Sequence, residues 1–238
     1  MLRSRIERGT ELGMSGREPL RSKPADWMYR LHTDYWTMAK KSTPVLSRAN
    51  LWSLEEYAKR RPTFRTEVIA HKKNRTVHLG NHLALQFEDE MTVRYQIQEM
   101  LRIEAEDEND IDGIQGELDA YLPLIPDGSN LKATMMLEYT DEIERKRQLA
   151  QLIGIEDRVW IQVEGSSKLY SIADEDQDRE NDYKASSVHF LRFELTKEMK
   201  AALKYGVGLA VGVDHPRYKA AINPIPQTVR NALVADLK

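Results

Sequence analysis

Three strand-like segments follow one another in the second half of the chain without a helical crossover between them. They are VWIQVE (159–164), LYSIA (169–173) and VHFLRFEL (188–195). A parallel pair of strands needs a connection of about a dozen residues or more, usually a helix, whereas antiparallel strands need only a turn. Further strands are expected at 75–79, 83–87, 132–139 and 207–213. The pattern predicts an α+β fold in which a mainly antiparallel sheet of about six strands packs against several helices.

Helices are expected where a capping residue precedes a helical pattern. The first runs through SLEEYAKR (53–60), with Glu55 and Glu56 in its first turn, and Pro62 is expected to end it. A second segment at 63–71 leads into a hairpin, whose turn contains Gly80 and Asn81. The remaining helices are expected at 91–104, 117–122, 141–152, 196–205 and 226–238.

The helix expected at 91–104 carries polar residues within its apolar side. At about 100° per residue, one arc contains Val93, Ile97, Met100, Leu101 and Ile103. Gln96 and Glu104 fall inside the same arc. Buried amide and carboxylate groups need partners, so this helix holds either a structural hydrogen-bond network or a functional site.

The opposite face of that helix is expected to be solvated. Glu99 and Gln98 lie three and four positions before Arg102, which places them within pairing distance on the outer side.

The chain divides by composition into three parts. Residues 1–37 are basic and rich in Gly, Pro and Ser, so we expect a poorly ordered extension, with Met38 as an alternative start of the native protein. Residues 38–220 are expected to form one α+β domain. Residues 221–238 are expected to be a C-terminal tail with a short helix, in which Val229, Leu233 and Leu237 share one side.

Composition excludes several kinds of chemistry. The chain has no cysteine, which removes thiol nucleophiles, disulfides and cysteine-ligated zinc or iron–sulfur clusters. A formal net charge of −3 gives no reason to expect a nucleic-acid partner. The apolar stretches fall far short of the roughly 18 residues that a membrane span needs. We therefore expect a soluble, cytoplasmic protein.

The acidic stretch EAEDENDIDG (104–113) partly matches a calcium-binding loop. Glu108, Asp110, Asp112 and Asp119 fall at positions one, three, five and twelve. Position one prefers Asp and position twelve needs a bidentate Glu, whereas this chain has Glu108 and Asp119 there, so the match to the calcium-loop pattern is incomplete. These four residues are weak candidates for metal binding, and a solvated acidic loop is the alternative.

Histidine and glutamate side chains give candidates for acid–base or metal chemistry. Glu104, His189 and His215 are the candidate catalytic residues, because a buried or strand-end Glu or His can act as a base or ligate a metal. Gln96 and Glu99 are candidates for cofactor binding. A structural ion pair for Glu104 and a hydrogen-bond anchor for Gln96 are the alternatives. The sequence contains no HExxH and no G-x-S-x-G motif.

Several motifs in fixed order resemble a known family. The runs RPTFRTEVIAHKK, RYQIQEMLRIE, ELDAYLPLIPDGSNLKATMMLEY, VHFLRFEL and GVDHPRY are similar to bacterial proteins known only as a domain of unknown function, number 3501. The likeness covers about Leu46 to Tyr218. Genes of that family often neighbour genes for rubrerythrin and iron–sulfur oxidoreductases. The resemblance therefore implies a redox or peroxide-stress setting and a rubrerythrin-like or iron–sulfur partner, and it transfers no catalytic residue.

Two functions follow as predictions. The first is a non-catalytic accessory or interaction protein of a redox system, favoured by the lack of a complete catalytic motif. The alternative is a small metal-dependent or acid/base enzyme that uses Glu and His side chains. The cofactor and the oligomeric state stay open.

Overall fold

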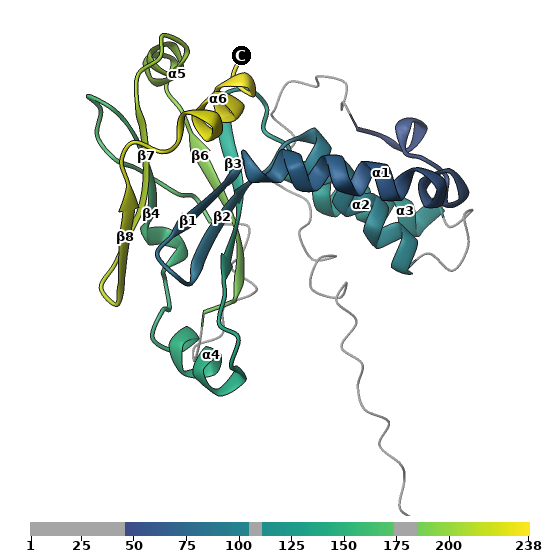
Figure 1. The fold of residues 1–238 in the computed structure, drawn as a ribbon, viewed down its shortest axis with the longest axis horizontal. Coiled ribbons are helices and arrows are strands. Elements are labelled where there is room, and N and C mark those ends of the chain that lie inside the picture. Colours follow the sequence, from purple (N-terminus) through teal and green to yellow (C-terminus); the bar gives the residue numbers. More distant parts are fainter. Residues whose placement is uncertain (1–45, 105–110, 174–184) are drawn as a thin grey trace, which may run out of the picture.

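Within the part of the chain that the structure describes, eight strands form two antiparallel sheets. The computed structural model describes residues 46–104, 111–173 and 185–238 (Figure 1). One sheet, here called sheet A, has the order β1-β2-β3-β6, and the other, sheet B, has the order β5-β4-β7-β8. The strands of sheet A are β1 (Thr76–Leu79), β2 (Leu83–Phe87), β3 (Asn130–Leu137) and β6 (Val188–Glu194). Those of sheet B are β4 (Val159–Val163), β5 (Leu169–Tyr170), β7 (Leu209–His215) and β8 (Tyr218–Ile222).

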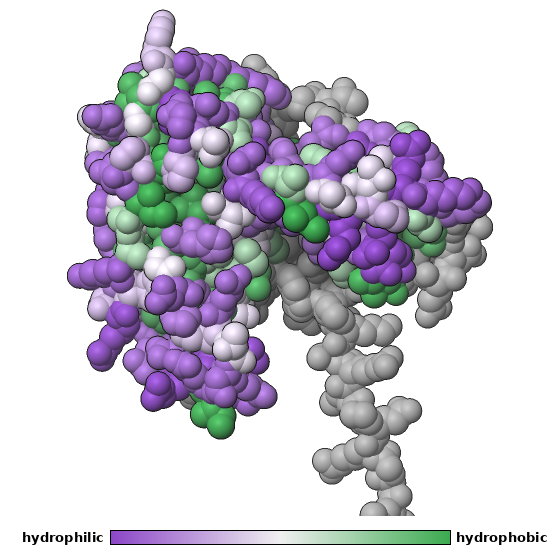
Figure 2. All heavy atoms as spheres, viewed as in Figure 1, coloured by the Kyte–Doolittle hydropathy of each residue, from purple (hydrophilic) through white to green (hydrophobic). Residues whose placement is uncertain are grey.

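The main core lies between the two sheets. Side chains alternate along a strand, so each sheet turns one row of apolar residues toward the other. Leu85 of β2 pairs with Met135 of β3, and both belong to this core. Ile161 and Val211 pair in sheet B and belong to the same core. Figure 2 shows hydrophobic residues of this layer between β8 and β1, where the sheets come together at one side of the molecule.

The α+β class and the antiparallel pairing are confirmed, and the strands divide between two sheets instead of one of about six. Inward-facing apolar residues alternate in the same way in one sheet or in two facing sheets, so the pattern cannot distinguish them. The strand β8, YKAAI, was not expected from the sequence. It is an edge strand whose alternate residues are only partly buried, which leaves a weak apolar pattern.

The first helix, α1 (Leu54–Lys73), runs through Pro62, so the prediction that Pro62 ends a helix is wrong. Proline removes one backbone donor and does not by itself prevent helical backbone angles on both sides. Tyr57 precedes Pro62, and Phe64 and Val68 follow it, on the side that packs against α2 (Glu90–Glu104). Tertiary packing on both sides of the proline thus holds α1 as one element.

Helices α1, α2 and α3 (Ile111–Tyr121) project from the side of the two sheets, as Figure 1 shows. In α2, Val93, Ile97 and Leu101 are buried as expected, but Ile103 is 64% exposed. The prediction that Gln98 lies on the outer face is wrong, because its side chain is 0% exposed. Its amide oxygen accepts a hydrogen bond from the backbone N–H of Trp52 at 2.8 Å. The sequence pattern does not indicate this contact, because Trp52 is 46 residues away from Gln98 in the sequence.

Short helices cover the ends of the two sheets. Asp141 and Thr196 cap α4 (Glu142–Leu149) and α5 (Lys197–Lys204) as expected, each side chain accepting a hydrogen bond from a backbone N–H. The last helix is α6 (Gln227–Ala235). The single turns of 3₁₀ helix are η2 (Arg48–Asn50), η3 (Leu122–Leu124) and η4 (Glu156–Arg158).

The segment expected to be a C-terminal tail contains α6. The apolar residues that were predicted to share one side of this helix face the main core. Val229, Leu233 and Leu237 are all buried there. Residues 1–37 lie outside the described part of the chain. No helix within the described ranges is long and apolar enough to cross a membrane.

Candidate functional site

The residues predicted as a site have separate partners in the structure. His189, on β6, is completely buried, and its Nε2 lies 2.9 Å from the carbonyl oxygen of Ser186. Its Nδ1 lies 3.8 Å from a carboxylate oxygen of Glu156. His215 ends β7, where its Nδ1 accepts a hydrogen bond from the backbone N–H of Arg217. These contacts do not bring the two histidines to a common centre.

His215 has the contacts of a structural residue. Its Nε2 lies 3.2 Å from the carbonyl oxygen of Ile153. Because Nδ1 accepts a hydrogen bond, Nε2 carries the proton and donates it to that carbonyl. Burial lowers the pKa of His215 below its ordinary value, which favours this neutral form.

Glu99 joins α1 to α2. The guanidinium of Arg61 donates two hydrogen bonds to its carboxylate, at 2.6 and 2.9 Å, and the hydroxyl of Tyr57 donates a third at 2.7 Å. Arg102 also lies 3.3 Å away, as the spacing predicts. Arg61 lowers the pKa of Glu99 to about 2, with help from Tyr57 and against the effect of burial. A carboxylate held so firmly in its charged form suits a structural clamp.

The acidic stretch and Glu104 are described only in part. Glu104 is the last residue of α2, and its side chain lies outside the described set, as do Glu108 and Asp110. Asp112 and Asp119 lie in the helix α3, where Asp119 accepts a hydrogen bond from Gln115. The calcium site therefore stays a prediction. Within the described ranges, no group of three or more His, Asp or Glu is placed to hold a metal ion.

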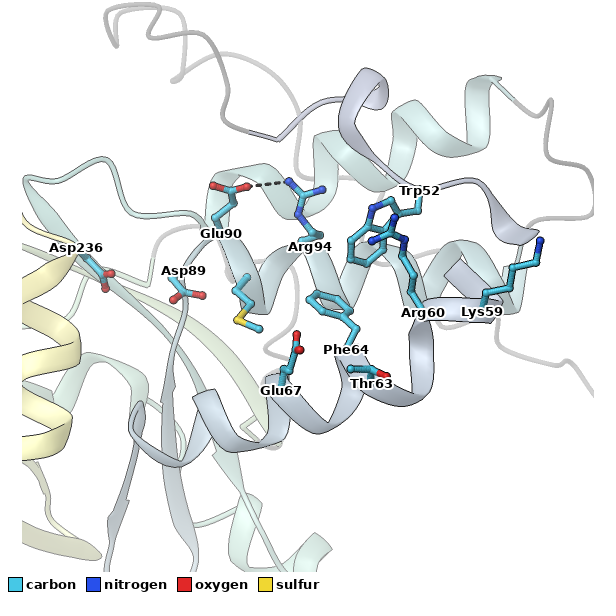
Figure 3. A pocket seen from close by; sticks show the side chains of 11 residues that line it. Trp52, Lys59, Arg60, Thr63, Phe64, Glu67, Asp89, Glu90, Arg94 and Asp236 are labelled. Carbon is cyan, nitrogen blue, oxygen red and sulfur yellow. Dashed lines mark hydrogen bonds and ion pairs between the residues drawn. The ribbon is translucent and has the colours of Figure 1, made fainter. Parts of the chain in front are cut away.

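A groove with a volume of about 860 Å³ lies between α1 and α2 (Figure 3). We call it the helical groove. Its lining residues are Trp52, Lys59, Arg60, Thr63, Phe64, Glu67, Asp89, Glu90, Met91, Arg94 and Asp236. Figure 3 shows Asp89 and Asp236 at the end nearest the sheets and Trp52, Arg60 and Lys59 at the other end. The groove is thus acidic at one end and basic and aromatic at the other.

The basic end is built around one indole ring. The guanidinium groups of Arg60 and Arg94 lie 5.2 and 5.9 Å from the ring centre of Trp52. The ring of Phe64 meets Trp52 edge-on at 4.9 Å and forms part of the apolar floor. Arg94 also pairs with Glu90 at 2.9 Å, so the groove presents a fixed, partly neutralised surface.

The acidic end is held by a buried arginine. Arg75, which follows α1, is 2% exposed, and its guanidinium contacts the carboxylates of both Asp89 and Asp236. Burial raises the pKa of Asp236 more than Arg75 lowers it. Burial also raises the pKa of Asp89, but Arg75, a backbone hydrogen bond from Thr92 and the nearby His71 together keep it below its ordinary value.

His71 is a functional candidate that the sequence did not single out. Its Nε2 lies 2.5 Å from Oδ2 of Asp89, and a third of its side chain is exposed. The sequence signal would have been weak, because His71 lies in the last turn of α1 and Asp89 follows β2, in another element. Asp89 also caps α2, accepting a hydrogen bond from the N–H of Thr92 while its own N–H donates to the Thr92 hydroxyl. The pair therefore has a structural role whatever else it does.

These features define an α+β protein with two facing sheets and a helical projection that carries a groove. The chain belongs to the family described as a protein of unknown function (DUF3501), whose model matches residues 45–237. The match extends beyond Tyr218 and includes α6, which the resemblance seen in the sequence had left outside.

A solved structure supports the same assignment. The chain is 55% identical to a novel protein of unknown function from Burkholderia pseudomallei, seen in a crystal structure, with a TM-score of 0.76. The likeness covers 81% of this chain and 99% of that one. No curated protein matches the chain.

Proposed function

We propose that this chain is a non-catalytic, cytoplasmic accessory protein that binds an extended segment of a redox protein in the helical groove. The observation that carries the proposal is the groove itself, with an apolar floor between an acidic and a basic end. The family resemblance supplies the redox setting, with a rubrerythrin-like or iron–sulfur protein as the partner.

The charged groups of the groove favour docking over catalysis. Arg60 is paired with Glu56 at 2.7 Å, and Arg94 with Glu90. Groups already paired in this way make a preformed recognition surface, since little side-chain entropy is lost when a partner binds. Glu67 is exposed and has no ion pair among the described residues, so it offers an available carboxylate at the middle of the groove.

The shape and charge indicate how a partner segment lies. A basic side chain of the segment is placed near Glu67 and Glu90, and an acidic one near Lys59 and Arg60. An apolar side chain between them contacts Phe64 and the other residues of the floor. Complementary charge at two separated points fixes the direction in which the segment binds.

Site-specific photocrosslinking in native cells tests this proposal. A benzophenone amino acid at Thr63, which is exposed and lines the groove, is expected to capture a redox or iron–sulfur protein. The matched control places it at Arg65, also exposed on α1 but outside the groove lining. Charge reversal by Glu67→Lys in the Thr63 background should reduce capture at least several-fold. Equal capture at both positions, or capture of a protein without redox function, would contradict the proposal.

A second candidate function rests on His71 and Asp89. A histidine oriented by a carboxylate at 2.5 Å and partly open to solvent has the geometry of a general base. Hydrolysis of activated esters such as p-nitrophenyl acetate tests this alternative. Enzymatic turnover that is lost in His71→Asn while the fold is retained would favour catalysis. Turnover equal to that of the His71→Asn variant would remove this class of reaction.

A further inference from the structure

A second hollow, distinct in its lining from the helical groove, lies between sheet A and α2. Its volume is about 360 Å³, and we call it the sheet pocket. Its lining residues are Lys72, Gln86, Glu88, Thr92, Val93, Gln96, Met100, Tyr121, Leu124, Thr134, Met136, Val188 and Phe190. A volume of this order accommodates a small molecule.

One wall of the sheet pocket is the face of sheet A that points away from the main core. Gln86, Thr134 and Phe190 lie side by side on β2, β3 and β6, because Gln86 pairs with Thr134 and Thr134 pairs with Phe190. Met136 and Val188 form the adjoining row. Residues directly opposite on neighbouring strands point to the same face, so these side chains make one continuous wall.

A buried carboxylate lies in this largely apolar setting. Glu88, 9% exposed, follows β2 and accepts a hydrogen bond on each of its two oxygens. The hydroxyl of Thr134 donates to one oxygen at 2.6 Å, and the hydroxyl of Thr92 donates to the other. Within the described part of the chain, Glu88 has no ion pair. Lys72 lines the same pocket, but its ammonium group lies outside ion-pair distance of the Glu88 carboxylate.

The carboxylate of Glu88 has capacity for further hydrogen-bond donors. An ionised carboxylate has about four acceptor positions, and only two are used here by protein hydroxyls. A buried negative charge without a cation is costly, so an ammonium or N–H group arriving at Glu88 gains both charge and hydrogen bonding. The two threonines hold the carboxylate in a fixed orientation before any ligand binds.

Gln96 supplies a second polar group. Its amide nitrogen donates to the hydroxyl of Tyr121 at 3.3 Å, which fixes the orientation of the amide. Its amide oxygen has no donor among the residues that the structure describes, and Gln96 lines the pocket. Gln96, predicted from the sequence as a cofactor-binding candidate, thus lines the same pocket as Glu88.

We propose that the sheet pocket binds a small aromatic amine, with the ammonium group at Glu88 and the ring between Met100, Met136 and Phe190. Sulfur-containing and aromatic side chains make favourable contacts with a ring. The amide oxygen of Gln96 is the second acceptor for the N–H groups of such a ligand. The sheet pocket therefore discriminates in favour of cations over neutral or anionic molecules of equal size.

Methionine-methyl NMR of the full chain tests this inference with phenethylamine as the probe. The methyl signals of Met100 and Met136 should shift in a saturable way, whereas that of Met91, which lines the helical groove, should not. Phenethyl alcohol and 3-phenylpropionate have similar size without the positive charge. We expect them to bind at least tenfold more weakly than phenethylamine.

Variants assign the effect to Glu88. Glu88→Gln, which keeps the size of the side chain, should weaken phenethylamine binding at least tenfold. The matched control Glu144→Gln, exposed on α4 and outside both pocket linings, should leave it unchanged. Absence of saturable shifts at Met100 and Met136, or equal binding of the three probes, would overturn the inference. The comparison of probes uses the unaltered chain, so it decides the matter even where Glu88→Gln fails to fold.

Discussion

The guanidinium of Arg75 binds the carboxylate of Asp236 and so joins the end of the first long helix to the last helix of the chain. The same guanidinium donates hydrogen bonds at 3.1 Å to the carbonyl oxygens of Phe87 and Glu88, where β2 leads into α2. One buried cation therefore fixes the helical projection to the two sheets. It also sets the acidic end of the helical groove.

Replacing Arg75 should destabilise the whole chain. Arg75→Met removes the only charge that compensates Asp236 in the described ion pairs and leaves two buried carbonyls without these donors. Breaking a buried pair on one side costs about 3–5 kcal/mol in the free energy of unfolding. Urea denaturation measures this loss. The exposed Arg65→Met on α1 is the control and should change stability by less than about 0.5 kcal/mol.

Glu99 should make stability depend on acid pH. Its pKa is lowered from 4.5 to about 2, chiefly by Arg61. A carboxyl group with a lowered pKa in the folded state contributes stability above its ordinary pKa, and that contribution is lost as the pH falls from 4.5 through about 2. The difference in free energy of unfolding between the natural chain and Glu99→Gln should therefore shrink over this range. A difference that is constant with pH would show that the clamp does not act through charge.

Gly212 should tolerate no side chain. A Cβ at this position would lie 2.3 Å from an indole carbon of Trp160, which packs across the glycine on sheet B. Gly212→Ala should lower the free energy of unfolding by about 1–3 kcal/mol through overpacking. Gly208→Ala is the matched control, because its Cβ would meet the flexible end of Glu164 at 3.1 Å. Thermal unfolding followed by tryptophan fluorescence should show a larger loss for Gly212→Ala; equal losses would contradict this packing.

Pro62 should weaken α1 even though it does not end it. Pro62→Ala restores one backbone donor inside a continuous helix and removes the steric conflict with the preceding turn. The free energy of unfolding is expected to rise by up to about 3 kcal/mol, which is the cost of an interior proline relative to alanine. Chemical denaturation checks the gain. An unchanged or lower stability would mean that the helix bends at Pro62 to fit its neighbours.

Local signals in the sequence predict most elements correctly. The hairpin at Gly80, the caps at Asp141 and Thr196, and the strand at 132–139 each depend on a few neighbouring residues. The errors arise where distant contacts decide the outcome. Pro62 lies within a helix because residues both before and after it in α1 pack against α2. Gln98 is buried because its side chain accepts a hydrogen bond from the backbone N–H of Trp52.

The candidate sites show the same division. Gln96 was recognised as a polar residue on an apolar helix face, which is a periodic feature of one element. Glu88, Asp89 and His71 gave no such signal. Each lies at the end of an element, and its role depends on partners such as Thr134 and Arg75 that other elements supply.

The sequence by itself determined the α+β class, the antiparallel pairing and the absence of cysteine chemistry. These follow from alternation, turn residues and composition, all of which act over short distances along the chain. Only the tertiary structure decided that the strands form two sheets, that Arg75 meets Asp236, and that Glu88 and Gln96 line one pocket. The physical reason is that burial and pairing of charges depend on neighbours in space, and no periodic pattern along the sequence records which distant residues those neighbours are.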